Sequence, residues 1–304
     1  MSKYIDPFTD FGFKYIFGQK TFLIAFLNSL FENSQGCEPI VDVEYKDKEL
    51  NRVFRERRGV IYDINCTTSD GKVLIVEMQN GSQDFFADRT RFYIARSIVE
   101  QGKAGNEWNF QLAPVFLIAL INFKMDVLGD RLRTDIAPCI LQTCEPFTYK
   151  ERSILINLPE FNESDPDKCK SKFEQWLFTL KNMKTMDAMP FTTNPVFKSL
   201  STWAEYAALS EDERYAYDSE LQVMRDYTNQ LNYQFNQGKA EGKAEGKAEG
   251  KVEGIAEGKV EGRAEGRAEE RTEIIHQLVA FGMSAEQIAK ALKMSVYEVE
   301  RILK

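Results

Sequence analysis

The sequence contains a single histidine, His276, in its C-terminal part. A Ser-His-Asp triad, a Cys-His pair or a His-rich metal site in the main domain is therefore excluded. The five cysteines are an odd number without a CxxC pair, which is typical of reduced cytoplasmic thiols rather than of a disulfide framework. No apolar run approaches the ~20 residues of a membrane span, and the N-terminus lacks the apolar core of a signal peptide. These absences predict a cytoplasmic protein without a membrane partner.

The chain also has no surplus of basic residues. Its 39 Lys and Arg stand against 47 Asp and Glu, and the net charge of −8 argues against broad, nonspecific binding to nucleic acid. Basic residues nevertheless crowd the segment before Asp63: Lys46, Lys48, Arg52, Arg55, Arg57 and Arg58. Such a cluster either holds phosphates beside a site or guards a solvated edge strand with charge.

Segment 59–79 indicates two apolar, β-branched strands around a Ser-Asp-Gly turn. A three-residue loop at 69–71, with Gly71 in the left-handed conformation, pairs Thr68 with Lys72. A two-residue Asp-Gly turn would instead shift the register by one and move every side chain to the other face. The interpretation of this hairpin therefore depends on its register.

In the three-residue register, two acids face each other. Asp63 falls opposite Glu77, about 5 Å away, and the period of two puts Gln79 on the same face. Two carboxylates this close repel each other and are costly to desolvate unless a cation lies between them. With carboxylates as the remaining ligands, the cation should be Mg²⁺ or Mn²⁺ rather than zinc. The alternative is that both acids simply point at solvent.

Hydrophobic periodicity outlines the rest of the main region. Helices are expected over 21–31, 84–101, 168–183 and 195–235, and strands over 114–121 and 152–158. A strand, a turn and the approach to the hairpin are expected over 41–57. The resulting order of helix, three strands, helix and strand predicts an α/β fold with a mixed sheet.

Residues 238–270 repeat a four-residue Gly-Lys-Ala-Glu unit. Identical charges recur at i+4, so the usual i,i+4 attraction is absent, and each glycine costs up to about 1 kcal/mol in a helix. A lone helix here would be weak. The repeat is either an association helix with an Ala/Val/Ile seam or a flexible, net-neutral spacer, and it carries no chemistry.

Three short helices are expected after the repeat, over 272–281, 284–292 and 295–303, with Ser284 and Ser295 as N-caps. The pattern resembles a small helix-turn-helix unit. Its balanced charge, with Glu298 and Glu300 on the third helix, favours a packing or oligomerisation bundle over duplex reading.

Several short motifs in this order resemble the PD-(D/E)XK nuclease family transposases, also called recombination-promoting nucleases. The resemblance runs from Asp6 to about Phe123. The matching pieces are Thr9–Gly18 (TDFGFKYIFG), Phe26–Asn28, Asp63, Glu77–Gln79, and Arg89 with Tyr93. It implies a restriction-endonuclease-like mixed sheet flanked by helices and Mg²⁺-dependent hydrolysis of phosphodiesters.

Carried over by position, the resemblance makes Asp63 and Glu77 the metal ligands. Gln79 stands where the superfamily usually has lysine, and a neutral amide orients water but does not stabilise charge as an ammonium does. Asp10 would lie near the site from the first helical segment. The candidates for contacting phosphate are Lys14, Arg55, Arg57, Arg58, Arg89 and Tyr93.

The resemblance thus implies a metal-dependent DNA endonuclease, of the transposase or recombination-promoting kind, with DNA as its partner. If the repeat is an association helix, the protein forms a homo-oligomer through its tail. The alternative is a catalytically silent, oligomerising interaction protein that keeps the nuclease fold. The expected organisation is a nuclease-like core over 1–160, a helical extension over 161–237, the repeat over 238–271 and a small bundle over 272–304.

Overall fold

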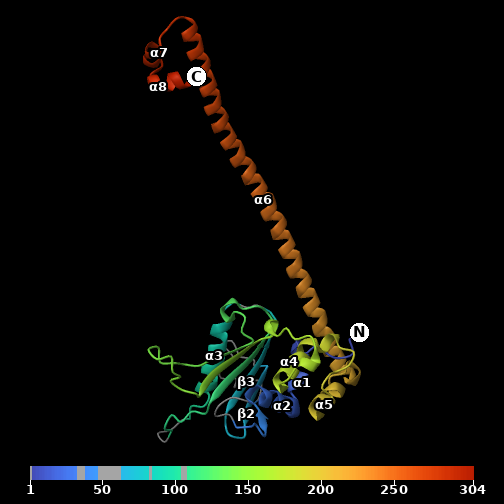
Figure 1. The fold of residues 1–304 in the computed structure, drawn as a ribbon. Coiled ribbons are helices and arrows are strands. Elements are labelled where there is room, and N and C mark those ends of the chain that lie inside the picture. Colours follow the sequence, from blue (N-terminus) through green and yellow to red (C-terminus); the bar gives the residue numbers. More distant parts are fainter. Residues whose placement is uncertain (1, 33–37, 47–62, 82–83, 104–107) are drawn as a thin grey trace. The chain divides into compact units, whose positions relative to one another are not determined.

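The computed structural model describes residues 2–32, 38–46, 63–81, 84–103 and 108–304 (Figure 1). Their contacts divide the chain into two compact units, Met1–Met224 and Arg225–Lys304. The expected approach to the hairpin, with most of the basic cluster, lies outside the described residues.

The first unit is built on a mixed six-stranded sheet. Its strands are β1 (Val43–Tyr45), β2 (Ile64–Thr68), β3 (Val73–Gln79), β4 (Val115–Ile121), β5 (Arg133–Ile136) and β6 (Glu151–Asn157). They lie in the order β1-β2-β3-β4-β6-β5. The central pairs β3·β4 and β4·β6 are parallel, whereas β1·β2, β2·β3 and β5·β6 are antiparallel. The expected mixed sheet is confirmed.

Helices cover both faces of this sheet (Figure 1). One face packs against α1 (Asp10–Phe17), α2 (Lys20–Phe31), α4 (Lys172–Asn182) and α5 (Pro195–Trp203). The other face packs against α3 (Phe86–Val99). Short 3₁₀ turns lie at Asp126–Leu128, Leu158–Glu160, Pro166–Lys168, Met183–Thr185 and Tyr206–Ala208. Since β4 is buried along its whole length, it forms the middle of this α/β/α arrangement.

The β2–β3 hairpin has the register predicted for a three-residue loop. Thr67 faces Val73, and the Thr68 N–H donates to the Lys72 carbonyl at 2.9 Å. Gly71 adopts a φ of +85°, which favours glycine. The two-residue alternative is wrong, because it would have shifted each of these pairs by one position.

The N-terminal helix α1 begins with a close backbone approach. The Thr9 Oγ1 accepts the Gly12 N–H at 2.8 Å, and a Cβ built on Gly12 would lie only 2.1 Å from the Asp6 carbonyl oxygen. Glycine is therefore required in the first turn of α1. The sequence did not predict this helix separately from α2.

We expect Gly12→Ala to lower the free energy of unfolding by about 1–3 kcal/mol, because the new methyl group forces the segment before α1 away from the helix. Chemical denaturation measures the change. Gly81→Ala is the control, since a Cβ there meets nothing within 4 Å. Equal stability of the two variants would contradict the close approach at Gly12.

The second unit contains most of α6 (Glu211–Ala280), together with α7 (Ala285–Leu292) and α8 (Val296–Ile302). The repeat is helical throughout and lies within α6. The helix expected over 272–281 is therefore not separate, because α6 continues through it. Ser284 and Ser295 are N-caps, as predicted, and each also forms a capping box. Ile275, Ile288 and Val299 form a small buried core.

Other sequence expectations need smaller corrections. The helix expected over 168–183 begins only at Lys172, after a 3₁₀ turn. The helical region expected over 195–235 is broken between α5 and α6 by a turn at Tyr206–Ala208. Strand β5 was not predicted, because its four residues are half-exposed and lack an apolar alternation.

Candidate metal centre

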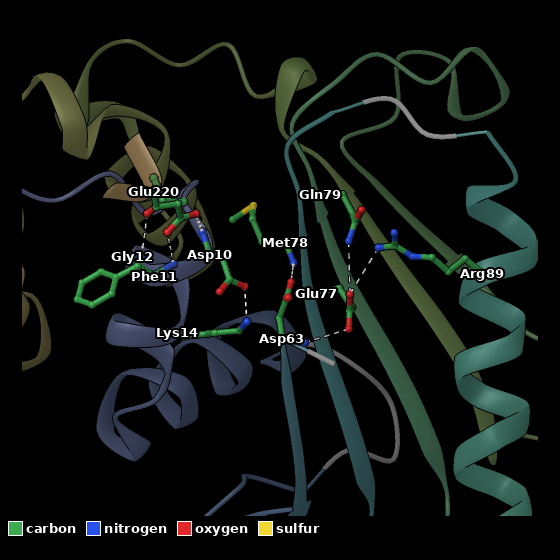
Figure 2. Close-up of polar contacts among 11 residues, drawn as sticks. Asp10, Phe11, Gly12, Lys14, Asp63, Glu77, Met78, Gln79, Arg89 and Glu220 are labelled. Carbon is green, nitrogen blue, oxygen red and sulfur yellow. Dashed lines mark hydrogen bonds and ion pairs between the residues drawn. The ribbon is translucent and has the colours of Figure 1, made fainter. Parts of the chain in front are cut away.

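Asp63 lies immediately before β2, at the end of the hairpin ladder. Continuing the register beyond Ile64 and Val76 puts it opposite Glu77. Its Oδ2 accepts the Met78 N–H at 2.8 Å, and its own N–H donates to the Glu77 Oε1 at 3.3 Å (Figure 2). Each of the two carboxylates thus accepts a hydrogen bond from a backbone N–H on the opposite side of the hairpin.

Glu77 is a buried acid near the C-terminal end of β3, and only 4% of it is exposed. The Gln79 side chain, 5% exposed, donates from Nε2 to the Glu77 Oε2 at 3.4 Å. Arg89 on α3 brings its Nη2 to 3.7 Å from the same oxygen (Figure 2). Glu77 is therefore held by an amide from its own strand and a cation from the facing helix.

Burial disfavours the charged form of both acids. Burial and then the charge of Asp63 raise the pKa of Glu77 to about 8. Burial also raises the pKa of Asp63, although the Met78 N–H and the charge of Lys14 oppose this shift. A positive charge placed beside the two acids would stabilise their ionised forms, because it offsets both the loss of hydration and the repulsion between the carboxylates.

The α1 helix brings a second pair of charges to the same place. Lys14 forms an ion pair with Asp10 one turn earlier and extends toward Asp63 (Figure 2). The charge of Lys14 lowers the pKa of both Asp63 and Glu77, whereas that of Asp10 raises the pKa of Asp63. Asp10 therefore lies near the acids but is paired with a lysine.

Tyr93 lies beside Arg89 on α3. The Arg89 guanidinium is 5.5 Å from the centre of the Tyr93 ring, a cation–π distance. Burial, and next the charge of Glu77, raise the pKa of Tyr93. Because the phenol keeps its proton, it can donate a hydrogen bond on the α3 side of the centre.

The donor set fits a hard divalent cation. Among the described residues, no group of three or more His, Cys, Asp and Glu is placed to hold a metal ion. Mg²⁺, however, commonly uses only one or two carboxylates and takes its other ligands from water and substrate phosphates. Asp63 and Glu77 meet this requirement, and burial, which raises the pKa of both acids, makes an added cation favourable there.

Most of the candidate residues from the sequence gather at this end of the sheet: Asp10, Lys14, Asp63, Glu77, Gln79, Arg89 and Tyr93. Their roles remain predictions. Arg55, Arg57 and Arg58 lie outside the described residues. Sequence reasoning missed Glu220, which contacts the start of α1 from about 210 positions away. No local signal could have revealed so distant a contact.

None of the described helices is long and apolar enough to cross a membrane. No curated protein and no solved structure matches the chain. A family model described as "PD-(D/E)XK nuclease family transposase" matches residues 7–234, which include the whole sheet and every residue of the centre. This match covers most of the chain, and the mixed sheet flanked by helices agrees with it. The chain therefore belongs to the PD-(D/E)XK nuclease family transposases.

Proposed function

We propose that this protein is a metal-dependent DNA endonuclease that hydrolyses phosphodiester bonds at the centre formed by Asp63 and Glu77. The main support is the pair of adjacent acids at the end of the β2–β3 hairpin, the buried Glu77 and the half-buried Asp63, whose carboxylates repel each other. The family match and the unfavourable burial of two carboxylates without a divalent cation support the same activity. The free cysteines agree with the cytoplasm as its location.

Asp63 and Glu77 would hold Mg²⁺ or Mn²⁺. When bound, such a cation polarises a phosphate oxygen and lowers the pKa of a water molecule. Gln79, fixed by its hydrogen bond to Glu77, orients the attacking water through its amide. It contributes no positive charge, so the charge that the superfamily's lysine would supply has to come from another residue.

Lys14 is the residue we assign to that task. It acts on both acids from α1, and its ion pair with Asp10 keeps the ammonium directed toward the centre. Arg89 offsets charge from the α3 side, next to Tyr93. The phosphate would thus lie between a lysine on one face of the sheet and an arginine on the other.

Cleavage of supercoiled plasmid DNA tests the proposal. The purified protein should nick or cut DNA with Mg²⁺ or Mn²⁺, and EDTA or Asp63→Ala should remove this activity. Cleavage that survives both treatments would indicate a contaminant or another site. A folded protein that binds no divalent cation and cleaves no DNA would instead support the catalytically silent interaction protein.

We expect Lys14→Met to reduce the cleavage rate about 10²-fold, the usual loss when one charge-stabilising group is removed from a reaction centre. Single-turnover cleavage with saturating Mg²⁺ measures it. Lys20→Met is the matched control, because Lys20 pairs with Asp42 at 3.0 Å rather than with the centre. Equal rates for the two variants would refute the role of Lys14.

A further inference from the structure

The start of α1, counted from its N-cap Thr9, has four backbone N–H groups without partners inside the helix, as every α-helix does, and that of Thr9 itself donates to the Asp6 carbonyl. Thr9 accepts only one of them, the N–H of Gly12. The N–H groups of Asp10 and Phe11 need acceptors from elsewhere, and together they form a positive helix end that favours a carboxylate. This end belongs to the helix that carries Lys14.

Glu220, in the third turn of α6, supplies that carboxylate. Its Oε1 accepts the Asp10 N–H at 2.5 Å, and its Oε2 accepts the Phe11 N–H at 2.8 Å (Figure 2). Each oxygen of one side chain thus satisfies one N–H. The buried Phe13, Ile16 and Phe17 already hold the apolar face of α1 in the core. The two-point contact of Glu220 adds a restraint at the first turn, on the polar side of the helix.

A second contact fixes the chain before α1 independently. The buried Tyr217 accepts the Asp6 N–H at 2.7 Å through its hydroxyl, and its ring lies 5.8 Å from that of Phe11. Tyr217 therefore keeps this segment against α6 when Glu220 is changed. Glu220 is left to restrain the first turn of α1, beyond what the core packing of this helix provides.

That orientation matters at the candidate metal centre. Asp10 and Lys14 are one turn apart on α1 and form an ion pair on the side that faces Asp63 (Figure 2). A rotation of α1 about its axis would turn both side chains away from the acids together. The hydrogen bonds of Glu220 are therefore connected to the placement of the Lys14 ammonium.

We propose that Glu220 is a positioning residue for the metal centre: its carboxylate clamps the first turn of α1 and thereby holds Lys14 toward Asp63 and Glu77. The kinetic part of this inference rests on the proposed nuclease function. The structural part does not, because the clamp consists of contacts within the metal-free protein. The structural part and the kinetic part are therefore tested by two different measurements.

The first measurement uses metal-free protein and needs no activity. In Glu220→Ala, amide hydrogen exchange at Asp10 and Phe11 should become at least tenfold faster. Labelling of Lys14 by acetic anhydride, read by mass spectrometry against Lys20 in the same chain, should rise several-fold. Glu211→Ala, which removes a carboxylate from the first turn of the same helix, is the matched control and should leave both unchanged.

The second measurement is a double-mutant cycle on cleavage. Glu220→Ala should lower kcat about tenfold with little change in KM for DNA, and Glu220→Gln, which retains one acceptor oxygen, should lose less. In a Lys14→Met background the Glu220 substitution should have almost no further effect. A merely structural role would give the same loss in both backgrounds.

The outcomes are distinct. Unchanged exchange and labelling in Glu220→Ala would overturn the clamp, whether or not the protein cleaves DNA. Faster exchange with additive losses in the cycle would overturn the positioning role. An inactive wild-type protein would refute the nuclease function alone, and the Lys14 labelling would still show whether Glu220 holds that lysine in place.

Discussion

Glu77→Gln should abolish DNA cleavage and, in the absence of metal, make the protein more stable at pH 8. The substitution removes one of the two proposed metal ligands, so we expect a loss of at least about 10³-fold in cleavage rate. It also removes a carboxyl group that is almost completely buried, since only 4% of Glu77 is exposed. Gln retains the shape of the side chain and an acceptor for the Asp63 N–H.

The pH dependence follows from the direction of the pKa shift. Glu77 has a pKa of about 8 in the folded protein, above the ordinary value of 4.5 that applies to the unfolded chain. Between these values the folded state binds the proton more tightly, so raising the pH destabilises the metal-free protein, by up to about 1.4 kcal/mol per pH unit. A divalent cation that binds the ionised pair should restore stability at pH 8 by mass action.

Chemical denaturation at pH 5 and pH 8, with EDTA or with Mg²⁺, measures these effects. The wild-type protein in EDTA should lose a few kcal/mol between the two pH values, and Glu77→Gln should lose much less. Mg²⁺ should stabilise the wild type at pH 8 but not the variant. Glu44→Gln, an exposed acid on β1, serves as the control. A wild-type stability that is independent of pH would show that Glu77 is ionised without difficulty in the folded protein.

The hairpin could be predicted because its information is local. The Ser-Asp-Gly loop requires a positive φ at Gly71, and this turn alone fixes the register that sets Asp63 opposite Glu77. The apolar runs of β3 and β4 depend only on neighbouring residues. The same reasoning could not show that each carboxylate makes its own backbone contact, because those contacts form only when the two strands meet.

The rest of the centre depends on contacts between distant segments. Lys14 and Asp10 are four residues apart, so their pairing could have been inferred once α1 was recognised. Their approach to Asp63 depends on the packing of α1 against the sheet. Glu220 comes from another helix entirely. Tertiary packing, rather than any sequence pattern, therefore decides which of the basic residues faces the acids.

The helical repeat differs from the hairpin, because its residues have a weak intrinsic preference for helix and yet form a regular helix within α6. Eight glycines occur at intervals of four between Gly238 and Gly266, and a Cβ added at any of them meets nothing within 4 Å. Packing within the described chain therefore does not explain them. Small residues on a helix surface allow another backbone to approach closely, and this favours association over a solitary helix.

The charges of the repeat also favour one direction of pairing. Successive residues are about 100° apart around a helix, so Lys and Glu columns lie on opposite sides, with the Ala and Gly columns between them. Two parallel copies that meet along the Ala or Gly column place Lys of one against Glu of the other on both flanks. An antiparallel pair would place like charges together. The repeat of four residues is longer than the 3.6 residues of one helical turn, so each column of identical residues winds around the helix in a right-handed direction. Two copies that meet along such a column should therefore form a right-handed supercoil.

We therefore predict that deleting residues 238–304 leaves the nuclease unit folded and able to bind a divalent cation but lowers its oligomeric state. Every candidate ligand lies in the first unit, which ends at Met224, whereas the repeat lies wholly in the second. Light scattering on the full-length and truncated proteins measures the mass of each, and Mn²⁺ binding checks the centre. Equal numbers of chains in both proteins would refute association through the tail, and an unfolded truncated protein would show that the tail stabilises the nuclease unit.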